Sequence, residues 1–234
     1  MDEPPSPAIV VEIRGDAKGR PRLIRLSDGR ELLVSDDACT RAGVAIGAVA
    51  NETFLAELDG AEQRAKAHEA ALRLLSHRAR SAKEMRTRLR MRGIEATAIE
   101  DEVARLETSG LLNDEQFARS WVADRGRMAP RGRRMLRYEL LGRGIDPEAV
   151  EEATSGVDDL ETARALARTR ARGSALESYE LFMSRVGGFL RRRGFSYDVV
   201  ATVIRETWAE SSGAPPSPDG AETVLGDGEV DEEL

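Results

Sequence analysis

A segment that occurs three times constrains the fold of this 234-residue chain more than any other feature. An arginine, a glycine and an apolar residue recur as Arg92-Gly93-Ile94, Arg143-Gly144-Ile145 and Arg193-Gly194-Phe195, with the glycines 51 and 50 residues apart. Positions 8 and 4 before each glycine and 6 and 10 after it are apolar in eleven of twelve cases. Residues four apart share a helix face, so each glycine is predicted to join two amphipathic helices as a left-handed C-cap. The twelve residues are Met85, Leu89, Ile99, Val103, Leu136, Leu140, Val150, Thr154, Val186, Leu190, Val200 and Ile204.

An earlier helix is predicted in each copy, aligned through Ala71, Ala118 and Ala163. The repeat therefore predicts three copies of three helices. A three-helix unit of about 50 residues has a marginal core. Adjacent units should therefore bury apolar faces against each other and form an elongated, curved body. A compact helical bundle with accidental periodicity is the alternative interpretation.

Helix-start signals support these boundaries. Ser81 followed by Glu84 is typical of a capping box. Asp146-Pro147 and Ser196 predict the starts of the third helices in the second and third copies. Glu95, at the equivalent place in the first copy, is a weaker signal because glutamate is a poor N-cap.

The first part of the chain has a different periodicity. Apolar residues alternate between Ile9 and Ile13, and two further apolar segments come next, at Leu23–Leu26 and Glu31–Val34. Asp28-Gly29, between the last two segments, suits a tight hairpin. The pattern predicts a small β-meander, which is too small to be stable alone and should pack on the next segment of the chain or on a partner.

The sequence thus predicts a mainly α-helical fold of three tandem three-helix repeats, preceded by a small β-meander and followed by a disordered acidic tail. The predicted parts are a disordered N-terminus (1–7), a β-rich segment (8–50), a linker helix (51–66), repeat 1 (67–112), repeat 2 (113–157), repeat 3 (158–208) and the tail (209–234).

Charge is unevenly distributed along the chain. Residues 64–144 carry 19 basic and 11 acidic side chains, a net charge of +8, although the whole chain has a net charge of −7. Residues 209–234 carry no basic and 8 acidic side chains. A locally basic block is a candidate surface for nucleic acid or an acidic partner, because attraction depends on the local field. Alternatively, its charges are ordinary solvent-exposed helix residues.

Several classes of function lack support in the sequence. A single Cys39 cannot form an internal disulfide, and no apolar run is long enough to span a membrane. His68 and His77 have no neighbouring cysteine to complete a zinc site. Residues 1–7 lack the features of an export signal. We therefore expect a soluble, cytoplasmic protein without catalytic residues, metal or cofactor.

Three segments of the helical region resemble the RecX family of bacterial recombination regulators. They are 81–89 (SAKEMRTRL), 111–118 (LLNDEQFA) and 130–145 (PRGRRMLRYELLGRGI). The resemblance covers roughly residues 67–208. Two details depart from the family pattern: Asn113-Asp114 stands where two aspartates are usual, and Pro130-Arg131-Gly132 differs in order from a basic residue followed by glycine and proline.

The resemblance implies a non-catalytic regulator of the RecA recombinase that acts in DNA repair, recombination and the SOS response. Such a protein lies in the helical groove of the RecA–single-stranded DNA filament and suppresses strand exchange and filament growth. The implied partners are the RecA filament and single-stranded or double-stranded DNA, with no membrane, and a monomer is expected. An independent DNA-binding module that acts without RecA is the alternative function.

The candidate contacts with RecA or DNA are basic residues that cluster in each repeat. In repeat 2 they crowd the start of the predicted second helix, where a basic face favours an anionic partner. Trp121 aligns with Leu74 and Leu166 and is therefore expected in the core rather than on a base-stacking surface. The candidates are Lys83, Arg86, Arg88 and Arg90 in repeat 1, Arg127, Arg131, Arg133, Arg134 and Arg137 in repeat 2, and Arg191 and Arg192 in repeat 3.

Overall fold

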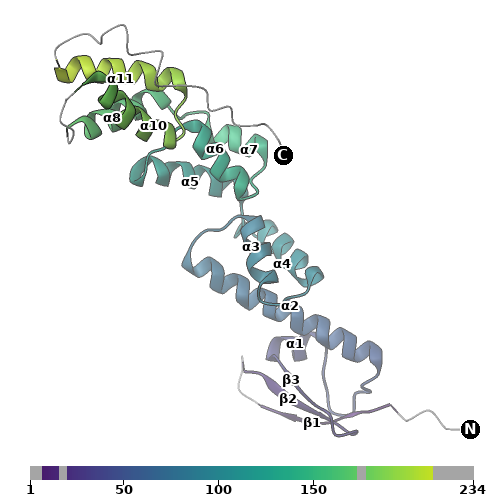
Figure 1. Cartoon of the computed structure of the whole chain (residues 1–234). Helices are drawn as coiled ribbons and strands as arrows, with labels where there is room; N and C mark the ends of the chain where they lie inside the picture. Colours follow the sequence, from purple (N-terminus) through teal and green to yellow (C-terminus); the bar gives the residue numbers. More distant parts are fainter. Residues whose placement is uncertain (1–6, 16–19, 173–177, 213–234) are drawn as a thin grey trace, which may run out of the picture. The chain divides into compact units, whose positions relative to one another are not determined.

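The computed structural model describes residues 7–15, 20–172 and 178–212, which divide into two compact units at Asn113 (Figure 1). The first unit holds the β-rich segment and repeat 1, and the second holds repeats 2 and 3. The predicted N-terminal disorder falls outside the described residues except at Pro7, and most of the predicted tail is also outside them.

The predicted β-meander is an antiparallel sheet with strand order β1-β2-β3. Its strands are β1 (Val10–Arg14), β2 (Arg22–Leu26) and β3 (Glu31–Val34). Gly29, with a φ of 89°, lies in the hairpin between β2 and β3, where the Leu26 N–H donates to the Arg30 carbonyl at 2.9 Å. A positive φ favours glycine at this turn.

A short helix that was not predicted from the sequence comes directly after the sheet. It is α1 (Asp36–Arg41), and the Ser35 hydroxyl caps it by accepting the Ala38 N–H at 3.2 Å. Six residues are too few to show a helical period, so only the cap indicates this helix in the sequence. The segment predicted as β-rich therefore contains one helix.

The linker helix predicted for residues 51–66 is the first part of the longer helix α2 (Glu52–His77), which runs on into repeat 1. Gly60 lies inside α2 without ending it. A glycine inside a helix costs only about 1 kcal/mol, which packing on both halves of α2 offsets. The first half packs on the sheet and α1, and the second half packs on repeat 1 (Figure 1).

The three repeats have the predicted helical composition. Repeat 1 uses α2, α3 (Ala82–Arg90) and α4 (Ala96–Thr108). Repeat 2 uses α5 (Asp114–Met128), α6 (Arg133–Gly142) and α7 (Pro147–Thr154). Repeat 3 uses α8 (Asp159–Ala171), a middle helix and α11 (Tyr197–Ser212), so its last helix extends four residues into the predicted tail. In each repeat the first and third helices pack along each other.

The middle helix of repeat 3 is interrupted. It consists of α9 (Tyr179–Phe182), a π-helical turn η1 (Met183–Gly187) and α10 (Gly188–Arg192). A π turn inserts an extra residue into the helix. Val186, within η1, and Leu190, after it, nevertheless remain fully buried, so both repeated apolar positions are kept despite the π turn.

The repeated positions form the cores. All twelve residues are at most 2% exposed, including Thr154, whose hydroxyl donates to the Val150 carbonyl at 2.8 Å. Gly93, Gly144 and Gly194 have φ values of 73°, 77° and 87°, as a left-handed cap requires. Each repeat has its own apolar core, and none of the helices in the described part of the chain is long and apolar enough to cross a membrane.

Candidate interaction surface of the second and third repeats

Two glycines bring repeat 2 and repeat 3 into backbone contact. Gly132 is the N-cap of α6, and its N–H donates to the Arg193 carbonyl at 2.8 Å. The Arg193 guanidinium in turn donates to the Pro130 carbonyl at 2.9 Å. A Cβ on Gly132 would lie only 2.5 Å from the Gly194 carbonyl oxygen, so this approach requires glycine. The loop that departs from the family pattern is therefore the joint between two repeats.

A second bond fixes the same joint. The Arg133 N–H, in the first turn of α6, donates to the Asp159 carboxylate of α8 at 2.8 Å. Burial raises the pKa of Asp159, and the bond from Arg133 opposes this rise. Apolar faces were predicted between adjacent units, but this joint is formed by backbone and charged groups. It sets the start of α6 against the end of α10.

Three candidate arginines meet beside this joint. Arg134 from α6 and Arg191 and Arg192 from α10 line one hollow of about 490 Å³. All three residues are exposed, and no described residue forms an ion pair or a hydrogen bond with their side chains. Tyr197, the first residue of α11, is 52% exposed and lines the hollow as well. We call this set of four residues the arginine hollow.

The other candidates in repeat 2 are paired with acidic side chains. Arg131 lies 2.9 Å from Glu139, and Arg127 lies 2.6 Å from Asp124. Arg133 and Arg137 both bind Glu151, the former at 2.5 Å. These pairs match the alternative interpretation of ordinary, neutralised helix charges. The same sequence cluster thus contains paired arginines and one, Arg134, that faces the hollow.

Glu139 organises the interior side of the cluster. Its carboxylate accepts the Arg125 Nε–H at 2.9 Å and the Trp121 indole N–H at 2.8 Å, in addition to its ion pair with Arg131. The Glu139 side chain is only 12% exposed. A mostly buried carboxylate with two hydrogen-bond donors and a further ion-pair partner stabilises the packing of α5 on α6.

Trp121 is only in part the core residue that its alignment predicted. It packs on the core of repeat 2 and stacks on Phe117 with ring centroids 6.0 Å apart. The guanidinium groups of Arg125 and Arg143 also lie against its ring, with their central carbons 4.4 Å and 3.8 Å from the ring centroid. These cation–π contacts already occupy the ring, so a base would have to compete with them.

The candidates of repeat 1 lie in the first unit. Arg86 pairs with Glu100 of α4 at 2.8 Å, and Lys83, Arg88 and Arg90 are exposed on α3. None of these four residues lines the arginine hollow.

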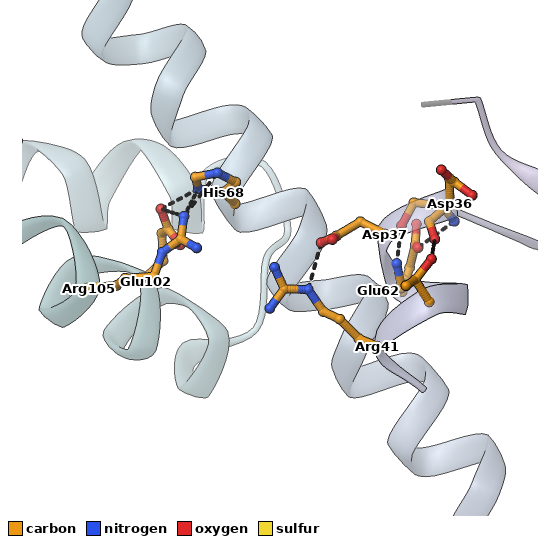
Figure 2. Close-up of polar contacts among 10 residues, drawn as sticks. Asp36, Asp37, Arg41, Glu62, His68, Glu102 and Arg105 are labelled. Atoms are coloured by element: carbon orange, nitrogen blue, oxygen red, sulfur yellow. Dashed lines mark hydrogen bonds and ion pairs between the residues drawn. The ribbon is translucent and has the colours of Figure 1, made fainter. Parts of the chain in front are cut away.

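The two histidines are not placed as metal ligands. His68 of α2 lies 2.9 Å from Glu102 of α4 and also contacts Arg105 (Figure 2). His77 is exposed at the end of α2. In the described residues, no three His, Cys, Asp or Glu side chains are grouped to hold a metal ion. Figure 2 also shows Glu62 of α2 turned toward α1, where it accepts the Ser35 N–H at 2.8 Å.

Two features of the surface were missed in the sequence. Tyr197 directly follows Ser196, which was identified only as a helix start, and a single aromatic residue in a first helical turn is a weak signal. Gly132 stood out only as a departure from a family pattern. Its role in the joint could not be predicted, because it depends on contact with Gly194, which lies 62 residues further along the chain.

Comparisons with known proteins agree with this architecture. Models of the first, second and third three-helix domains of RecX match residues 67–106, 113–153 and 157–204, more than half of the chain. The regulatory protein RecX of Amycolatopsis mediterranei is 34% identical over 178 residues, which are 75% of this chain and 97% of that protein. The RecX of Corynebacterium efficiens is 32% identical and covers 67% of this chain and 78% of its own.

Solved structures show the same fold. A crystal structure of regulatory protein RecX matches with a TM-score of 0.65 at 21% identity, covering 84% of this chain and 98% of that one. The structure of RecX from Lactobacillus salivarius matches with a TM-score of 0.57 at 29% identity, covering 63% and 97%. Sequence and fold lead to one conclusion: the chain belongs to the RecX family of regulatory proteins.

Proposed function

We propose that this protein binds the RecA–single-stranded DNA filament in its helical groove and inhibits or modulates ATP hydrolysis, strand exchange and filament extension. It acts as a cytoplasmic monomer and catalyses no reaction. Membership of a family of regulatory proteins carries the proposal. The arginine hollow supports it, because its arginines have no acidic partner among the described residues and a filament of protein and DNA offers phosphates and carboxylates that they can bind.

The repeated architecture suits a filament partner. Three similar units on one chain can contact more than one protomer of a repeating polymer. Linked contacts of this kind raise the effective affinity for the assembled filament over the free subunit. Occupying the groove obstructs a second DNA duplex without any chemical step. In this proposal the contacts come from the candidate residues of all three repeats.

RecA's DNA-dependent ATP hydrolysis and strand exchange test the function when this protein is added at substoichiometric amounts. We expect inhibition well below one molecule per RecA protomer. A variant that lacks the three arginines of the hollow, Arg134→Gln, Arg191→Gln and Arg192→Gln together, should inhibit less. The matched control is Arg20→Gln, Arg64→Gln and Arg73→Gln, which removes the same charge from the first unit. RecA activity that does not respond at any ratio would contradict the proposal.

Direct DNA binding is the second candidate function, and the three arginines of the hollow beside an exposed tyrosine favour it. Under this alternative the protein competes with RecA for DNA. Inhibition would then occur only when it covers the DNA completely, and it would disappear when more DNA is added. Inhibition that follows the ratio to RecA, at constant DNA, distinguishes the two functions.

A further inference from the structure

We propose that the arginine hollow is a binding site for the backbone phosphates of single-stranded nucleic acid, with Tyr197 as a platform for one base. This deepens the proposed function and rests on it, because it assigns one contact with the filament to DNA rather than to protein. The site lies within the second unit and uses residues from α6, α10 and α11.

The charge of the hollow favours an anion. Three guanidinium groups line it, and no acidic residue is found among its described lining residues. Most other arginines of repeat 2 are paired with carboxylates, as Arg131 is with Glu139 and Arg137 is with Glu151. Bringing three like charges together is unfavourable without a counter-charge, and an arginine fork binds phosphate with two parallel hydrogen bonds.

The position of the hollow adds to this preference. It lies at the N-terminal end of the 16-residue helix α11, where Ser196, directly before the helix, and Tyr197, its first residue, line it. The positive end of a helix dipole attracts phosphate. Its volume of about 490 Å³ is within the range of about 300–1,000 Å³ that is typical of small-molecule sites. A phosphodiester group with its sugar therefore has room.

The exposed aromatic side chains favour single-stranded nucleic acid over other anions. Tyr197 is 52% exposed at the hollow, and Tyr138, 76% exposed, follows Arg134 by one helical turn on the same face of α6. Single-strand binding sites combine a basic groove with aromatic side chains on which bases stack. An acidic peptide would use the arginines but not the rings, and the bases of a duplex are already stacked on each other.

The joint between the repeats holds the site in shape. Arg134 is the second residue of α6, next to the bond from Arg133 to Asp159, and Arg191 and Arg192 precede the Gly194 cap. The contact of Gly132 with Gly194 fixes these two helix ends against each other. Because the arginines are already held close together, ligand binding costs less side-chain conformational entropy.

Fluorescence anisotropy of a labelled ten-nucleotide oligo-dT, without RecA and over a salt series, tests the site in the full chain. We expect Arg134→Gln, Arg191→Gln and Arg192→Gln together to weaken binding on the order of tenfold. The slope of log affinity against log salt concentration should become shallower by about 2, because each of the three lost phosphate contacts contributes about 0.7. Tyr197→Leu should weaken binding about tenfold, and Tyr197→Phe should restore it, because the phenyl ring still stacks. The control Arg20→Gln, Arg64→Gln and Arg73→Gln should leave the slope nearly unchanged.

Two results would overturn this inference. One is oligo-dT binding that the triple variant of the hollow leaves unaltered. The other is a pair of observations: poly-glutamate of equal charge displaces oligo-dT, and Tyr197→Leu does not change oligo-dT affinity. That pair would assign the hollow to an acidic protein surface. The RecA assays separate these failures from failure of the proposed function. If the protein inhibits RecA but the triple variant binds oligo-dT as well as the parent, the proposed function stands and only this binding site is rejected.

Discussion

Gly132 and Gly194 pack backbone against backbone, and this contact joins repeat 2 to repeat 3. Neither position tolerates a Cβ without displacement of the facing segment. Gly194 is also in the left-handed region, with a φ of 87°, so a substitution there would add backbone strain. Gly132 has a φ of −70° and therefore isolates the effect of the close approach.

Gly132→Ala should destabilise the second unit by about 1–3 kcal/mol, the usual cost of overpacking a well-packed contact. Urea denaturation, followed by tryptophan fluorescence, measures the change. The control is Gly126→Ala in α5, where a Cβ would meet no atom within 4 Å. That change should be neutral or stabilise by up to about 1 kcal/mol, because alanine favours the helix. Equal stability of the two variants would show that the joint accommodates a side chain.

Glu139→Gln should destabilise repeat 2 by about 1–2 kcal/mol. The amide removes the negative charge that Arg125 and Arg131 share, and both guanidiniums are 29% exposed, so water screens part of the loss. Trp121 keeps an acceptor in the amide oxygen, and its emission reports the change in its surroundings. Glu115→Gln, at an exposed pair 3.7 Å apart, serves as the control and should have little effect. A glutamine variant as stable as the parent would mean that Glu139 contributes little.

Ser81→Ala should destabilise repeat 1 by about 1 kcal/mol, because α3 loses its N-cap. The Ser81 hydroxyl is fully buried and accepts the Glu84 N–H at 3.2 Å, so water cannot replace it. Thermal denaturation followed by circular dichroism measures the loss. Thr97→Ala, on the exposed face of α4, is the control that removes a hydroxyl without removing a cap. A melting curve that matches this control would argue against the cap.

Acidification should weaken the packing of α8 on α11. The Arg164 guanidinium binds both oxygens of Glu206, at 2.8 and 2.9 Å, and lowers the pKa of that carboxyl below its usual value near 4.5. The unfolded chain then binds the proton first, so this stabilisation is present above about pH 4.5 and is lost as the pH falls through the lower folded value. The pair is partly exposed, so its contribution is under about 1 kcal/mol.

The variant Glu206→Gln tests this sign. The difference in unfolding free energy between the parent and the variant should be largest near neutral pH and shrink below about pH 4.5. Chemical denaturation at a series of pH values gives the difference. Glu57→Gln on the exposed face of α2 provides the control. A difference that grows on acidification has the opposite sign and would reject the assignment.

Glu151→Gln should strengthen binding to an anionic partner. Glu151 holds both Arg133 and Arg137, so its neutralisation frees two guanidiniums for phosphate or carboxylate. An exposed pair is worth about 0.2–1 kcal/mol, which corresponds to an affinity gain of about 1.4- to 5-fold at low salt. Anisotropy with oligo-dT and with RecA-coated DNA measures the gain. Weaker binding would instead mean that Glu151 positions the two arginines for their partner.

Repeated residues made the helical fold predictable. Ala71, Ala118 and Ala163 are all fully buried, as are the positions around each glycine, because local helix geometry fixes which residues share a face. α1 was not predicted. Tertiary packing decided it, since this short helix packs against the sheet and α2 and the sequence pattern does not contain that contact.

The candidate surface was predictable by residue type but not by geometry. The basic cluster of repeat 2 was identified in the sequence, but Arg133 and Arg134 are neighbours with opposite surroundings: one binds Glu151 and the other lines the hollow. Which arginine meets an acidic side chain depends on α7 and α10, which lie up to about 60 residues away in the sequence. Periodicity within a single helix cannot supply that information.

α2 belongs to two cores at once. Leu58 and Ala61 pack with the sheet, whereas Ala67, Ala71 and Leu74 pack with α3 and α4. Deleting residues 1–50 would leave Leu58 and Ala61 facing solvent on a helix that repeat 1 still needs. The N-terminal sheet thus acts as a hydrophobic cover for the start of α2, and a shortened chain would need polar replacements there to avoid association through the exposed apolar face.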